Sequence, residues 1–364
     1  MGRESPSDRK PTWPRYLFAA ILLAGIAIGA YHIRSGKAEP SIHRITGETM
    51  GTTYSVTIVD RRDRVGAKDA MRRAVIGELD LVNMTMSRYQ RDSELYRFNQ
   101  SRSADPFPMS KTALEVLKKA LRLSEETGGA YDVTVTPLVK LWGFSDKRPR
   151  AEPPSDEELA AAMELVGWRK IEVDLDAGTI RKTDPRMTVD LSSIAKGAAV
   201  DQIARALDAY KHKDYMIEVG GEVRCKGESP RGTPWRIGIE QPLAGEREIR
   251  EVIELEDTAM ATSGDYRSFY DLSGKRLSHT IDPRTGRPIE HGLASVTVIH
   301  DSCAVADGLA TALTVLGPEE GFELAAKEEL NVLFITRKPD GTLVEHATDA
   351  FEEMRRSGKA PKGN

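Results

Sequence analysis

The sequence predicts a protein of the α+β class. It has 364 residues, of which 40% are hydrophobic, so one large or two fused domains can bury a sizeable core. Segments rich in β-branched residues and segments with helical spacing of apolar residues both occur along it. The expected strands do not alternate strictly with helices, which disfavours a doubly wound sheet, and the sequence shows no repeat of fixed period.

The first part of the chain is expected to contain two long helices after an initial strand. Residues 51–59 carry many β-branched side chains and predict a strand. A second helix is expected to begin after an N-cap at Ser110 and to stop at Gly128 and Gly129. The first helix is predicted by apolar residues at helical spacing, at Met71, Val75, Leu79 and Val82.

A proline-rich loop follows these helices. The stretch 147–154 contains three prolines and is expected to divide two lobes. Ser155 and Glu158 then have the spacing of a capping box that opens a short helix. The next expected elements are strands at residues 171–175 and 187–191 and a helix at residues 192–210.

The second half of the chain is richer in expected strands. Short runs of apolar and β-branched residues predict them at residues 215–219, 235–240, 250–256, 293–299 and 331–336. A helix at residues 302–316 is expected between the last two of these strands.

Composition and motifs exclude several classes of protein. The chain has 52 Lys and Arg against 56 Asp and Glu, a net charge of −4, and no long block of one sign, so we expect no nucleic-acid partner. It contains no G-x-G, G-K-[ST], H-E-x-x-H or G-x-S-x-G, which removes the Rossmann, P-loop, common zinc protease and common hydrolase signatures. Cys225 and Cys303 are expected to be two separately buried thiols, with a disulfide as the alternative.

An apolar segment near the N-terminus predicts the compartment. Residues 16–33 carry no charge and, as a helix, would extend about 27 Å, enough to cross a bilayer. Basic residues are more numerous before this run than after it, which favours a cytoplasmic tail at residues 1–15 and an exported body after a linker at residues 34–44. We therefore expect an inner-membrane anchor with the folded body in the periplasm. A cleaved signal peptide, which would give a soluble periplasmic form, and a buried helix of the globular body are the alternatives.

Asp307 and Thr311 form a candidate metal site. They are four residues apart in the expected helix at residues 302–316 and therefore share one face. A carboxylate and a hydroxyl are oxygen ligands of the kind that Mg²⁺ takes, with room for waters and phosphate oxygens. The alternative is structural: the threonine bonds back to a main-chain carbonyl and the aspartate is solvated.

Two further segments are candidates for contact with a ligand. Ser192 and Ser193 are expected N-caps, and the helix start that they define offers free N–H groups to a phosphate, with Gly197 permitting close approach. Gly220 and Gly221 interrupt an expected strand, which indicates a bulge or a ligand pressed against the backbone. A capped helix and a bulge without any ligand explain the two patterns equally well.

The stretch 261–288 is the richest in polar groups. Its segment Asp282-Pro-Arg-Thr-Gly286 is expected to be a turn, because proline suits the second turn position and glycine ends the turn. A hairpin with a polar tip would explain the proline and the glycine. It does not explain His279 between Ser278 and Thr280, so His279 is a candidate functional residue.

Eight short motifs occur in one order between residue 50 and about residue 317. They are Met50-Gly-Thr-Thr-Tyr54, Met86-Ser-Arg-Tyr-Gln-Arg-Asp-Ser-Glu94, Gly129-Ala-Tyr-Asp-Val-Thr134 with Pro137-Leu-Val139, Asp190-Leu-Ser-Ser-Ile-Ala-Lys-Gly197, Val219-Gly-Gly-Glu222, Thr262-Ser-Gly264, Ser278-His-Thr-Ile-Asp-Pro283 and Ala306-Asp-Gly-Leu-Ala-Thr311. In this order they resemble the motifs of the ApbE-type flavin transferases, the FAD:protein FMN transferases.

The resemblance implies a fold and a reaction. Over residues 45–350 it implies mixed sheets with helices in two lobes around a central flavin-binding cleft, of the ApbE or T-fold-like kind, followed by a polar C-terminal tail at residues 351–364. Such enzymes bind FAD between the lobes with Mg²⁺ at its pyrophosphate. They move FMN onto a Ser or Thr hydroxyl of an acceptor protein through a phosphoester bond and release AMP, which is phosphoryl transfer.

The resemblance also implies roles for individual residues. Asp307 and Thr311 match the family's side-chain metal ligands, and Ala195 matches its main-chain carbonyl ligand. His279, as the candidate general base on the incoming hydroxyl, and Asp307 are the expected catalytic residues. Tyr89 is the expected ring-stacking partner of the flavin. The positions at or near the family's FAD contacts are Met50, Tyr89, Ala130, Tyr131, Asp132, Ala198 and Ser278.

The resemblance further implies an acceptor protein of an exported or membrane redox complex, such as a quinone reductase, an Rnf-type complex or a nitrous-oxide reduction system. Many relatives are lipoproteins, but no cysteine follows the apolar run here, so the anchor would be the helix at residues 16–33 itself. Two other functions stay open. One is an FAD pyrophosphatase, in which water replaces the acceptor hydroxyl and FMN and AMP are the products, and the other is a non-catalytic FAD-binding assembly factor for an exported redox complex.

Overall fold

The computed structural model describes residues 40–61, 67–145, 150, 152–243, 248–264, 269–272 and 275–357. Contacts between residues divide the chain into two compact units, Met1–Ser41 with Arg61–Asp63 and Ile42–Asp60 with Arg64–Asn364. The first unit, with the expected anchor at residues 16–33, lies almost wholly outside the described residues, so the fold given below is that of the second. Within the described ranges, no helix is long and apolar enough to span a membrane.

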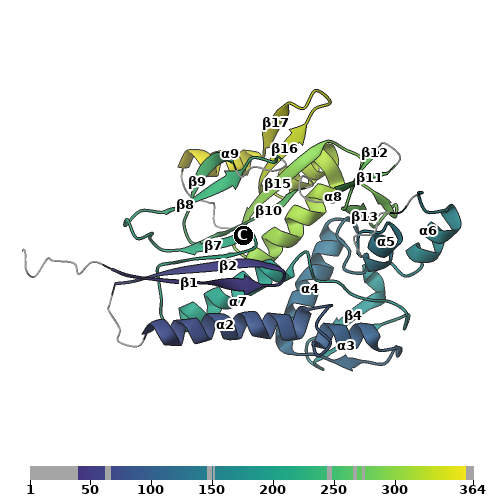
Figure 1. Cartoon of the computed structure of the whole chain (residues 1–364), viewed down its shortest axis with the longest axis horizontal. Coiled ribbons are helices and arrows are strands. Elements are labelled where there is room, and N and C mark those ends of the chain that lie inside the picture. Colours follow the sequence, from purple (N-terminus) through teal and green to yellow (C-terminus); the bar gives the residue numbers. More distant parts are fainter. Residues whose placement is uncertain are drawn as a thin grey trace, which may run out of the picture. The chain divides into compact units, whose positions relative to one another are not determined.

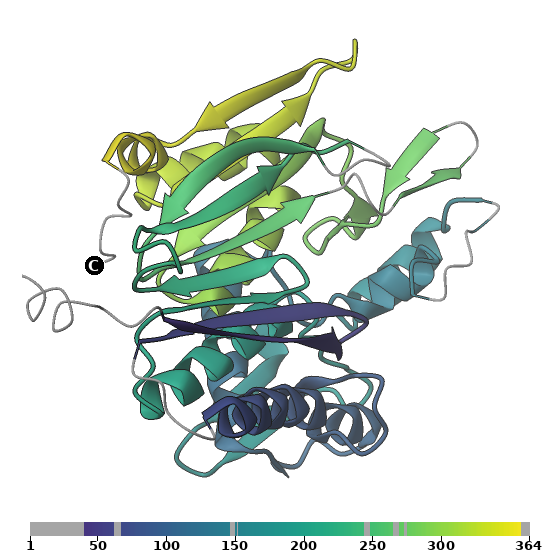
Figure 2. The same cartoon turned by 60° about the vertical axis from the view of Figure 1, so that its left-hand side comes forward.

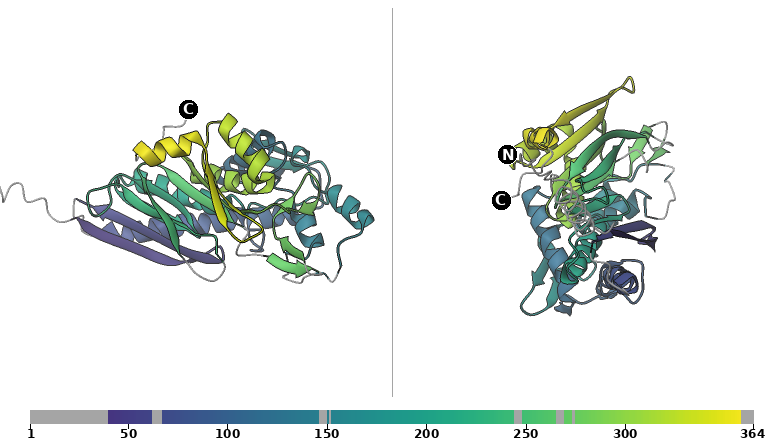
Figure 3. Two further views of the ribbon diagram at one scale, coloured as in Figure 1. Left: turned by 90° about the horizontal axis from the view of Figure 1, so that it is seen from above. Right: turned by 90° about the vertical axis from the view of Figure 1, so that its left-hand side faces the viewer.

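An eight-stranded sheet forms the centre of this unit, with the strand order β1-β2-β6-β7-β10-β15-β16-β17 (Figures 1 and 2). Every strand pairing in this sheet whose register is described is antiparallel. The α+β class is therefore confirmed, but the predicted mixture of parallel and antiparallel strands is not found among these pairings. The sheet twists, because β1 in purple and β17 in yellow run in clearly different directions (Figure 3). The strands are β1 (Ser41–Thr49), β2 (Thr52–Asp60), β6 (Tyr215–Val219), β7 (Glu222–Lys226), β10 (Ala259–Gly264), β15 (Leu293–His300), β16 (Asn331–Arg337) and β17 (Leu343–Ala347).

Alternate residues of the strands point into two separate hydrophobic cores. In β10, Ala259 and Ala261 lie in one core and Met260 lies in the other. Residues of α2 (Ala67–Met86), α4 (Lys111–Glu126), α7 (Ala195–Ala209) and α8 (Cys303–Lys327) complete the first core. Residues of β8 (Trp235–Glu240), β9 (Ile249–Leu255) and α9 (Asp349–Ser357) complete the second. Because both faces are covered, a central strand such as β15 is buried along nearly its whole length.

Smaller elements surround the sheet. β3, β5 and β4 form a three-stranded sheet, β11 with β12 and β13 with β14 form hairpins, and α5, α6 and β13 share a third small core. The turn predicted at residues 282–286 joins β13 to β14 and is confirmed. These elements are α3 (Glu94–Gln100), β3 (Phe107–Pro108), α5 (Thr136–Leu141), α6 (Asp156–Met163), the 3₁₀ helix η1 (Trp168–Lys170), β4 (Ile171–Asp174), β5 (Thr179–Lys182), β11 (Phe269–Leu272), β12 (Lys275–Ser278), β13 (Ile281–Asp282) and β14 (Arg287–Pro288).

The helices predicted from local signals are confirmed. The apolar stripe predicted for the first long helix is buried in α2. The Ser110 hydroxyl accepts the Ala113 N–H at the start of α4, and Ser155 and Glu158 make both bonds of the capping box in α6. Ser302 caps α8, whose first helical stretch ends at Gly317, where the backbone leaves the helical conformation. The continuation of α8 to Lys327 was not predicted.

The strand predicted at residues 187–191 is wrong. This segment is buried but irregular, because its main chain bonds to groups outside any strand. The Asn99 side chain binds both the N–H and the carbonyl of Val189, each at 2.8 Å, and the Asp190 N–H donates to the Val133 carbonyl at 2.7 Å. The apolar residues that predicted a strand therefore reflect burial alone.

The helix predicted from residue 192 begins at Ala195, as α7. Its N-cap residue makes no side-chain bond, so the predicted capping by Ser192 and Ser193 is wrong. Both hydroxyls donate elsewhere, Ser192 to the Asp190 carboxylate and Ser193 to the Tyr131 hydroxyl. These two serines therefore hold the segment before the helix in place and do not cap its first turn.

Gly220 and Gly221 form the turn between β6 and β7, and the predicted bulge is wrong. Val219 pairs with Glu222 across a two-residue connection, and the two glycines have φ of 63° and 106°. A two-residue hairpin turn of this kind needs positive φ at both positions, which glycine supplies. The glycine pair is explained without a ligand.

Two other predicted segments differ from or fall outside the described fold. Residues 351–357, in the predicted tail, lie in α9, where Phe351 and Met354 are buried. Half of the proline-rich stretch 147–154, residues 147–149 and 151, lies outside the described residues. Cys225 and Cys303 are both free and buried, as expected.

α7 and α8 touch each other at Gly197. A Cβ added to Gly197 would lie 2.3 Å from the Cys303 carbonyl oxygen and 2.8 Å from the Ala304 Cα. Both atoms belong to the main chain of α8, so they cannot rotate away as a side chain would. Only glycine lets the two helices come this close.

We predict that Gly197→Ala lowers the free energy of unfolding by about 1–3 kcal/mol or more, because the added methyl group must push two backbones apart. Urea unfolding measures this change. Gly77→Ala is the matched control in α2, where no atom lies within 4 Å of the added Cβ. The control is expected to gain about 0.5–1 kcal/mol from its higher helix propensity. Equal stability of the two variants would contradict the close contact.

Candidate active site

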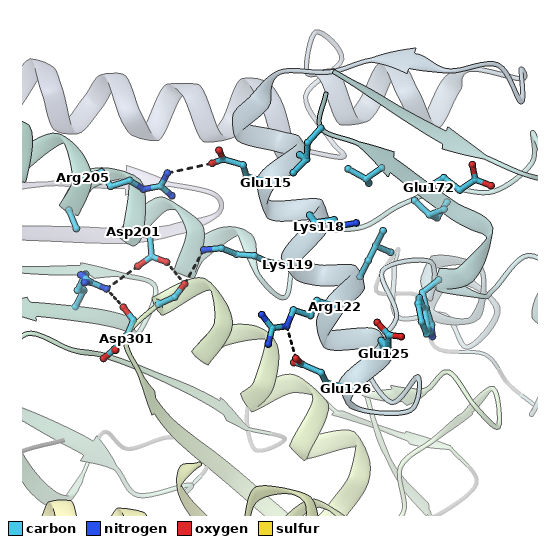
Figure 4. Close-up of a pocket in the computed structure, with 18 of the residues that line it drawn as sticks. Glu115, Lys118, Lys119, Arg122, Glu125, Glu126, Glu172, Asp201, Arg205 and Asp301 are labelled. Atoms are coloured by element: carbon cyan, nitrogen blue, oxygen red, sulfur yellow. Dashed lines mark hydrogen bonds and ion pairs between the residues drawn. The ribbon is translucent and has the colours of Figure 1, made fainter. Parts of the chain in front are cut away.

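Asp201, in α7, holds the start of α8 in place (Figure 4). One carboxylate oxygen accepts the Cys303 N–H at 3.0 Å. The other accepts the Ala304 N–H at 3.1 Å and the Ser302 hydroxyl at 2.7 Å. Arg224 is its counter-ion at 3.3 Å. N–H groups that a helix leaves unpaired at its start are thereby satisfied, and the positions of the following residues of α8 are fixed.

Asp307 lies one turn further along α8 and points back to α7. One of its carboxylate oxygens accepts the Gly197 N–H at 3.1 Å, and the other lies 3.3 Å from the Lys196 Nζ. The residue is 5% exposed, so the solvated aspartate considered as an alternative is excluded. The Thr311 hydroxyl donates to the Asp307 main-chain carbonyl at 3.3 Å, as the structural alternative for Thr311 expects, and its lone pairs stay available to a ligand.

Lys196 and Glu222 complete a cluster of charges around Asp307. The Lys196 ammonium lies 3.0 Å from one oxygen of Glu222, in addition to its contact with Asp307. Glu222 is the first residue of β7, directly after the Gly220–Gly221 turn, and is 3% exposed. Its second oxygen is buried and has no hydrogen-bond partner among the described residues. A buried oxygen left in this state is unfavourable unless something else binds it.

Burial shifts the pKa of all three groups. It raises the pKa of Asp307, against the opposing effects of Lys196 and the Gly197 N–H. Burial, followed by the nearby Asp307 carboxylate, raises the pKa of Glu222. Burial lowers the pKa of Lys196, but the two carboxylates outweigh it and the net shift is upward. A charged ammonium therefore stands between two carboxyl groups that gain from any further positive charge.

This cluster lies in the wall of a cavity of about 420 Å³. The cavity brings together six of the residues predicted for the site, which come from three distant parts of the chain. They are Ala130, Tyr131, Asp132, His279, Asp307 and Thr311. Lys196 and Glu222 also line the cavity, and both were missed as functional residues. The sequence signal was present, since each is a charged residue directly beside a glycine in a motif already noted.

Two of the cavity residues are held by internal bonds. Asp132 accepts the N–H and the hydroxyl of Thr134 at 2.7 and 2.6 Å, and it accepts the Trp168 N–H at 3.0 Å. The Tyr131 hydroxyl accepts from Ser193 at 3.0 Å, and burial raises its pKa, so the ring stays neutral. Both side chains are therefore rigid parts of the cavity wall.

The other predicted site residues do not line this cavity. Met50 lies in the turn between β1 and β2 with φ of 51°, and Ala195 is the first residue of α7. Ala198 and Ser278 are buried.

Tyr89 borders a different, smaller cavity of about 260 Å³. Its side chain is 72% exposed. The Arg88 guanidinium lies 4.6 Å from the ring centre and donates to the Tyr89 hydroxyl at 2.7 Å. Arg88 also pairs with Asp190 at 3.2 Å, and Asp190 lines the 420 Å³ cavity. This chain of contacts connects the exposed ring to the wall of the charged cavity.

A larger cavity of about 1200 Å³, shown in Figure 4, contains none of the predicted site residues. It lies beside α4 and the start of α8. Some charges on its wall pair with each other, for example Arg205 with Glu115 at 3.7 Å and Arg122 with Glu126 at 2.6 Å. Acidic and basic residues are nearly equal in number on the wall of this larger cavity. The candidate catalytic residues are instead concentrated in the 420 Å³ cavity around Asp307.

Comparison with known proteins gives a consistent match to one family. A model of the ApbE family matches residues 50–334. The FAD:protein FMN transferase of Vibrio cholerae is 43% identical over 332 residues, which are 90% of this chain and 97% of that protein. The protein of the same name from Haemophilus influenzae is 41% identical over 342 residues, covering 93% and 98%. The solved flavin transferase ApbE from Vibrio cholerae superposes with a TM-score of 0.78 at 43% identity, covering 86% of this chain and 99% of that one.

We predict that Asp201→Ala lowers the free energy of unfolding by about 3 kcal/mol, because it leaves buried donors at the start of α8 unpaired. Thermal and urea unfolding measure the loss. Arg205→Ala is the matched control on the same helix, since its ion pair with Glu115 at 3.7 Å is exposed and is expected to contribute at most about 1 kcal/mol. A loss no larger for Asp201→Ala than for the control would contradict the anchoring role.

Proposed function

The chain belongs to the ApbE family, and we propose that it transfers FMN from FAD to a Ser or Thr hydroxyl of an acceptor protein in a Mg²⁺-dependent reaction that releases AMP. Membership of this family makes the protein a transferase. The acceptor hydroxyl, the phosphoester bond, the metal and the AMP product are the finer parts of the proposal.

The observation that carries the proposal is the buried carboxylate of Asp307 at the wall of the cavity, one helical turn from the Thr311 hydroxyl. Phosphoryl transfer depends mainly on position and on neutralisation of charge. A carboxylate fixed by the Gly197 N–H, with an ammonium beside it, supplies a rigid polar wall for a diphosphate and its counter-ion.

The residues around Asp307 fit a magnesium ion. Within the described part of the chain, no group of three or more His, Cys, Asp and Glu side chains is placed to hold a metal. A site here would therefore combine Asp307 with the Thr311 hydroxyl, the Ala195 carbonyl and oxygens of water or substrate, which is how Mg²⁺ is usually bound. The unpartnered oxygen of Glu222 also indicates a wall that favours a cation. When bound, Mg²⁺ would neutralise charge on the diphosphate and stabilise the departing AMP.

His279 is proposed as the general base. It lines the same cavity as Asp307 and its side chain is exposed, so an incoming hydroxyl can reach it. Removal of the hydroxyl proton by its imidazole would prepare the oxygen to attack the phosphorus atom.

FAD is proposed to occupy both cavities. Tyr89 would stack on the flavin ring, since it is an exposed aromatic side chain in the cavity that Arg88 and Asp190 connect to the charged one. Met50, Ala130, Tyr131, Asp132, Ala198 and Ser278 are proposed as further contacts or as supports of these contacts.

The acceptor is proposed to be a subunit of an exported or membrane redox complex, such as a quinone reductase, an Rnf-type complex or a nitrous-oxide reduction system. The apolar run at residues 16–33 supports an inner-membrane anchor with the catalytic domain in the periplasm, or a cleaved periplasmic form. An acceptor on the same side of the membrane would then be accessible to the cavity.

An FAD pyrophosphatase is the second candidate. The exposed position of His279 favours it, because water reaches this residue as easily as a protein hydroxyl does. Release of free FMN at a rate that is indifferent to the acceptor would identify this activity. Accumulation of acceptor with covalently added FMN would identify the transferase.

We predict that Asp307→Asn slows FMN transfer by about 100-fold or more, because several kcal/mol of charge stabilisation are lost while the amide oxygen can still accept the Gly197 N–H. The intact mass of the acceptor and the release of AMP measure the rate. Chelation should stop the unaltered enzyme, and Mg²⁺ should restore it. Asp208→Asn, outside the 420 Å³ cavity, is the control, and equal rates in the two variants would contradict the role of Asp307.

We predict that His279→Asn slows transfer to the acceptor by about 10²–10⁴-fold, the usual contribution of a general base, and leaves FAD affinity within a few-fold of the original. Quenching of flavin fluorescence measures the affinity, and acceptor mass measures the transfer. A variant that binds FAD and transfers at the original rate would eliminate His279 as the base.

A further inference from the structure

Lys196 has two carboxylate partners, but only one of them has an oxygen without a hydrogen-bond partner in the described residues. Asp307 uses its second oxygen to accept the Gly197 N–H. Glu222 contacts Lys196 through one oxygen at 3.0 Å, and its second oxygen is buried without a hydrogen-bond partner in the described residues. The Lys196 ammonium therefore lies between Asp307, whose two oxygens both have partners, and Glu222, which has one oxygen that can still accept a hydrogen bond.

The cluster carries one more negative than positive charge when both carboxylates are ionised. Asp307 and Glu222 face a single ammonium, that of Lys196. Buried ion pairs seldom add to stability, because the loss of hydration offsets their attraction. An excess buried charge together with an unpaired oxygen is unfavourable for the fold in itself, so these features are better explained by a ligand that binds to the cluster.

We propose that Lys196 and Glu222 are positioning residues that set the affinity of the Asp307 site for its divalent cation: Lys196 neutralises Asp307 in the absence of the cation, and Glu222 receives the ammonium when the cation binds. This inference rests on the metal dependence in the proposed function. It assigns a role in metal binding to Lys196 and Glu222, which have no role of their own in the proposed reaction.

The geometry suits such an exchange. The Lys196 Nζ is already 3.0 Å from Glu222 and 3.3 Å from Asp307, so a small rotation of the side chain moves it fully onto Glu222. A lysine ammonium is a compact charge with three rotatable donors on a flexible stem, whereas the two carboxylates are fixed on β7 and α8. The cation would replace the ammonium at Asp307 and gain the attraction of the excess negative charge.

Charge alone then predicts an order of metal affinities. Lys196→Met leaves the cluster with one more negative charge and should bind the cation more tightly. Glu222→Gln removes one negative charge and the place that receives the ammonium, and should bind about tenfold more weakly. The double variant has the same net charge as the original cluster and should bind with nearly the original affinity.

The test measures binding of Mn²⁺, used as a probe for Mg²⁺, to the full-length protein. Electron paramagnetic resonance reports free Mn²⁺ in titrations with and without saturating FAD and with no acceptor present. The titrations are run at mildly alkaline pH, so that the raised pKa of Glu222 does not leave it protonated. Lys226→Met is the matched control, because its ion pair with Asp208 lies outside the cluster.

The inference is supported if Lys196→Met binds more tightly than the original protein, Glu222→Gln binds more weakly, and the double variant and the control bind like the original. If the double variant stays as weak as Glu222→Gln, Glu222 ligates the metal directly and the inference is wrong. Equal affinities in all variants would also overturn it. Should Lys196→Met fail to fold, the expected tenfold difference in Mn²⁺ affinity between Glu222→Gln and the double variant still tests the inference.

A second readout separates this inference from the proposed function. Lys196→Met leaves two buried carboxylates without a counter-ion, so it should melt lower than the original without metal and gain more from Mn²⁺. Absence of Mn²⁺ binding to the unaltered protein, even with FAD, would overturn both the metal dependence and the inference. A wrong order of affinities among proteins that do bind Mn²⁺ would overturn the inference alone.

Discussion

The contact between α7 and α8 determines where Lys196 and Asp307 of the candidate site lie. Each helix binds groups near the start of the other. Asp201 of α7 accepts the first N–H groups of α8, and Asp307 of α8 accepts the Gly197 N–H of α7. The absence of a side chain at Gly197 brings the two backbones together. Since the two helices supply Ala195, Lys196, Asp307 and Thr311, a change in their separation would move all four residues at once.

The parts of the fold that depend on neighbouring residues could be predicted from the sequence. The capping box of α6, the Ser110 cap of α4 and the buried stripe of α2 each arise within one or two helical turns, so their signals are complete in a short segment. Residues 187–191 looked like a strand because they are apolar. Their main chain is instead bound by Asn99, 90 residues away from Val189 in the sequence, and no local pattern contains that information. The late start of α7 has a similar origin for Ser193, whose hydroxyl bonds to Tyr131, 62 residues away. The other expected cap, Ser192, bonds to its near neighbour Asp190.

The candidate site was predictable to the extent that its residues stand in recognisable motifs. The motifs containing Ala130 to Asp132, His279, Asp307 and Thr311 come from distant parts of the chain, and the cavity unites them. Lys196 and Glu222 lie in such motifs too, but their importance depends on a pairing that only the fold creates. Lys196 and Asp307 are 111 residues apart in the sequence. Charged residues are normally expected at the surface, so the burial of Asp307 and the half-burial of Lys196 could not be anticipated from composition.

The two cavities differ in a way that suits a ligand with two different ends. The cavity around Asp307 is charged, and the Asp307 carboxylate in its wall is buried and held by the Gly197 N–H. The cavity at Tyr89 has an exposed aromatic ring, supported on one side by Arg88. A charged diphosphate loses much hydration on burial and therefore needs fixed partners, whereas a flat ring gains from stacking even at an open surface. Arg88 contacts the Tyr89 ring and also pairs with Asp190 in the charged cavity, so one side chain connects the two cavities. In the proposed function, this connection would place the bond to be broken beside Asp307, where the groups that stabilise charge lie.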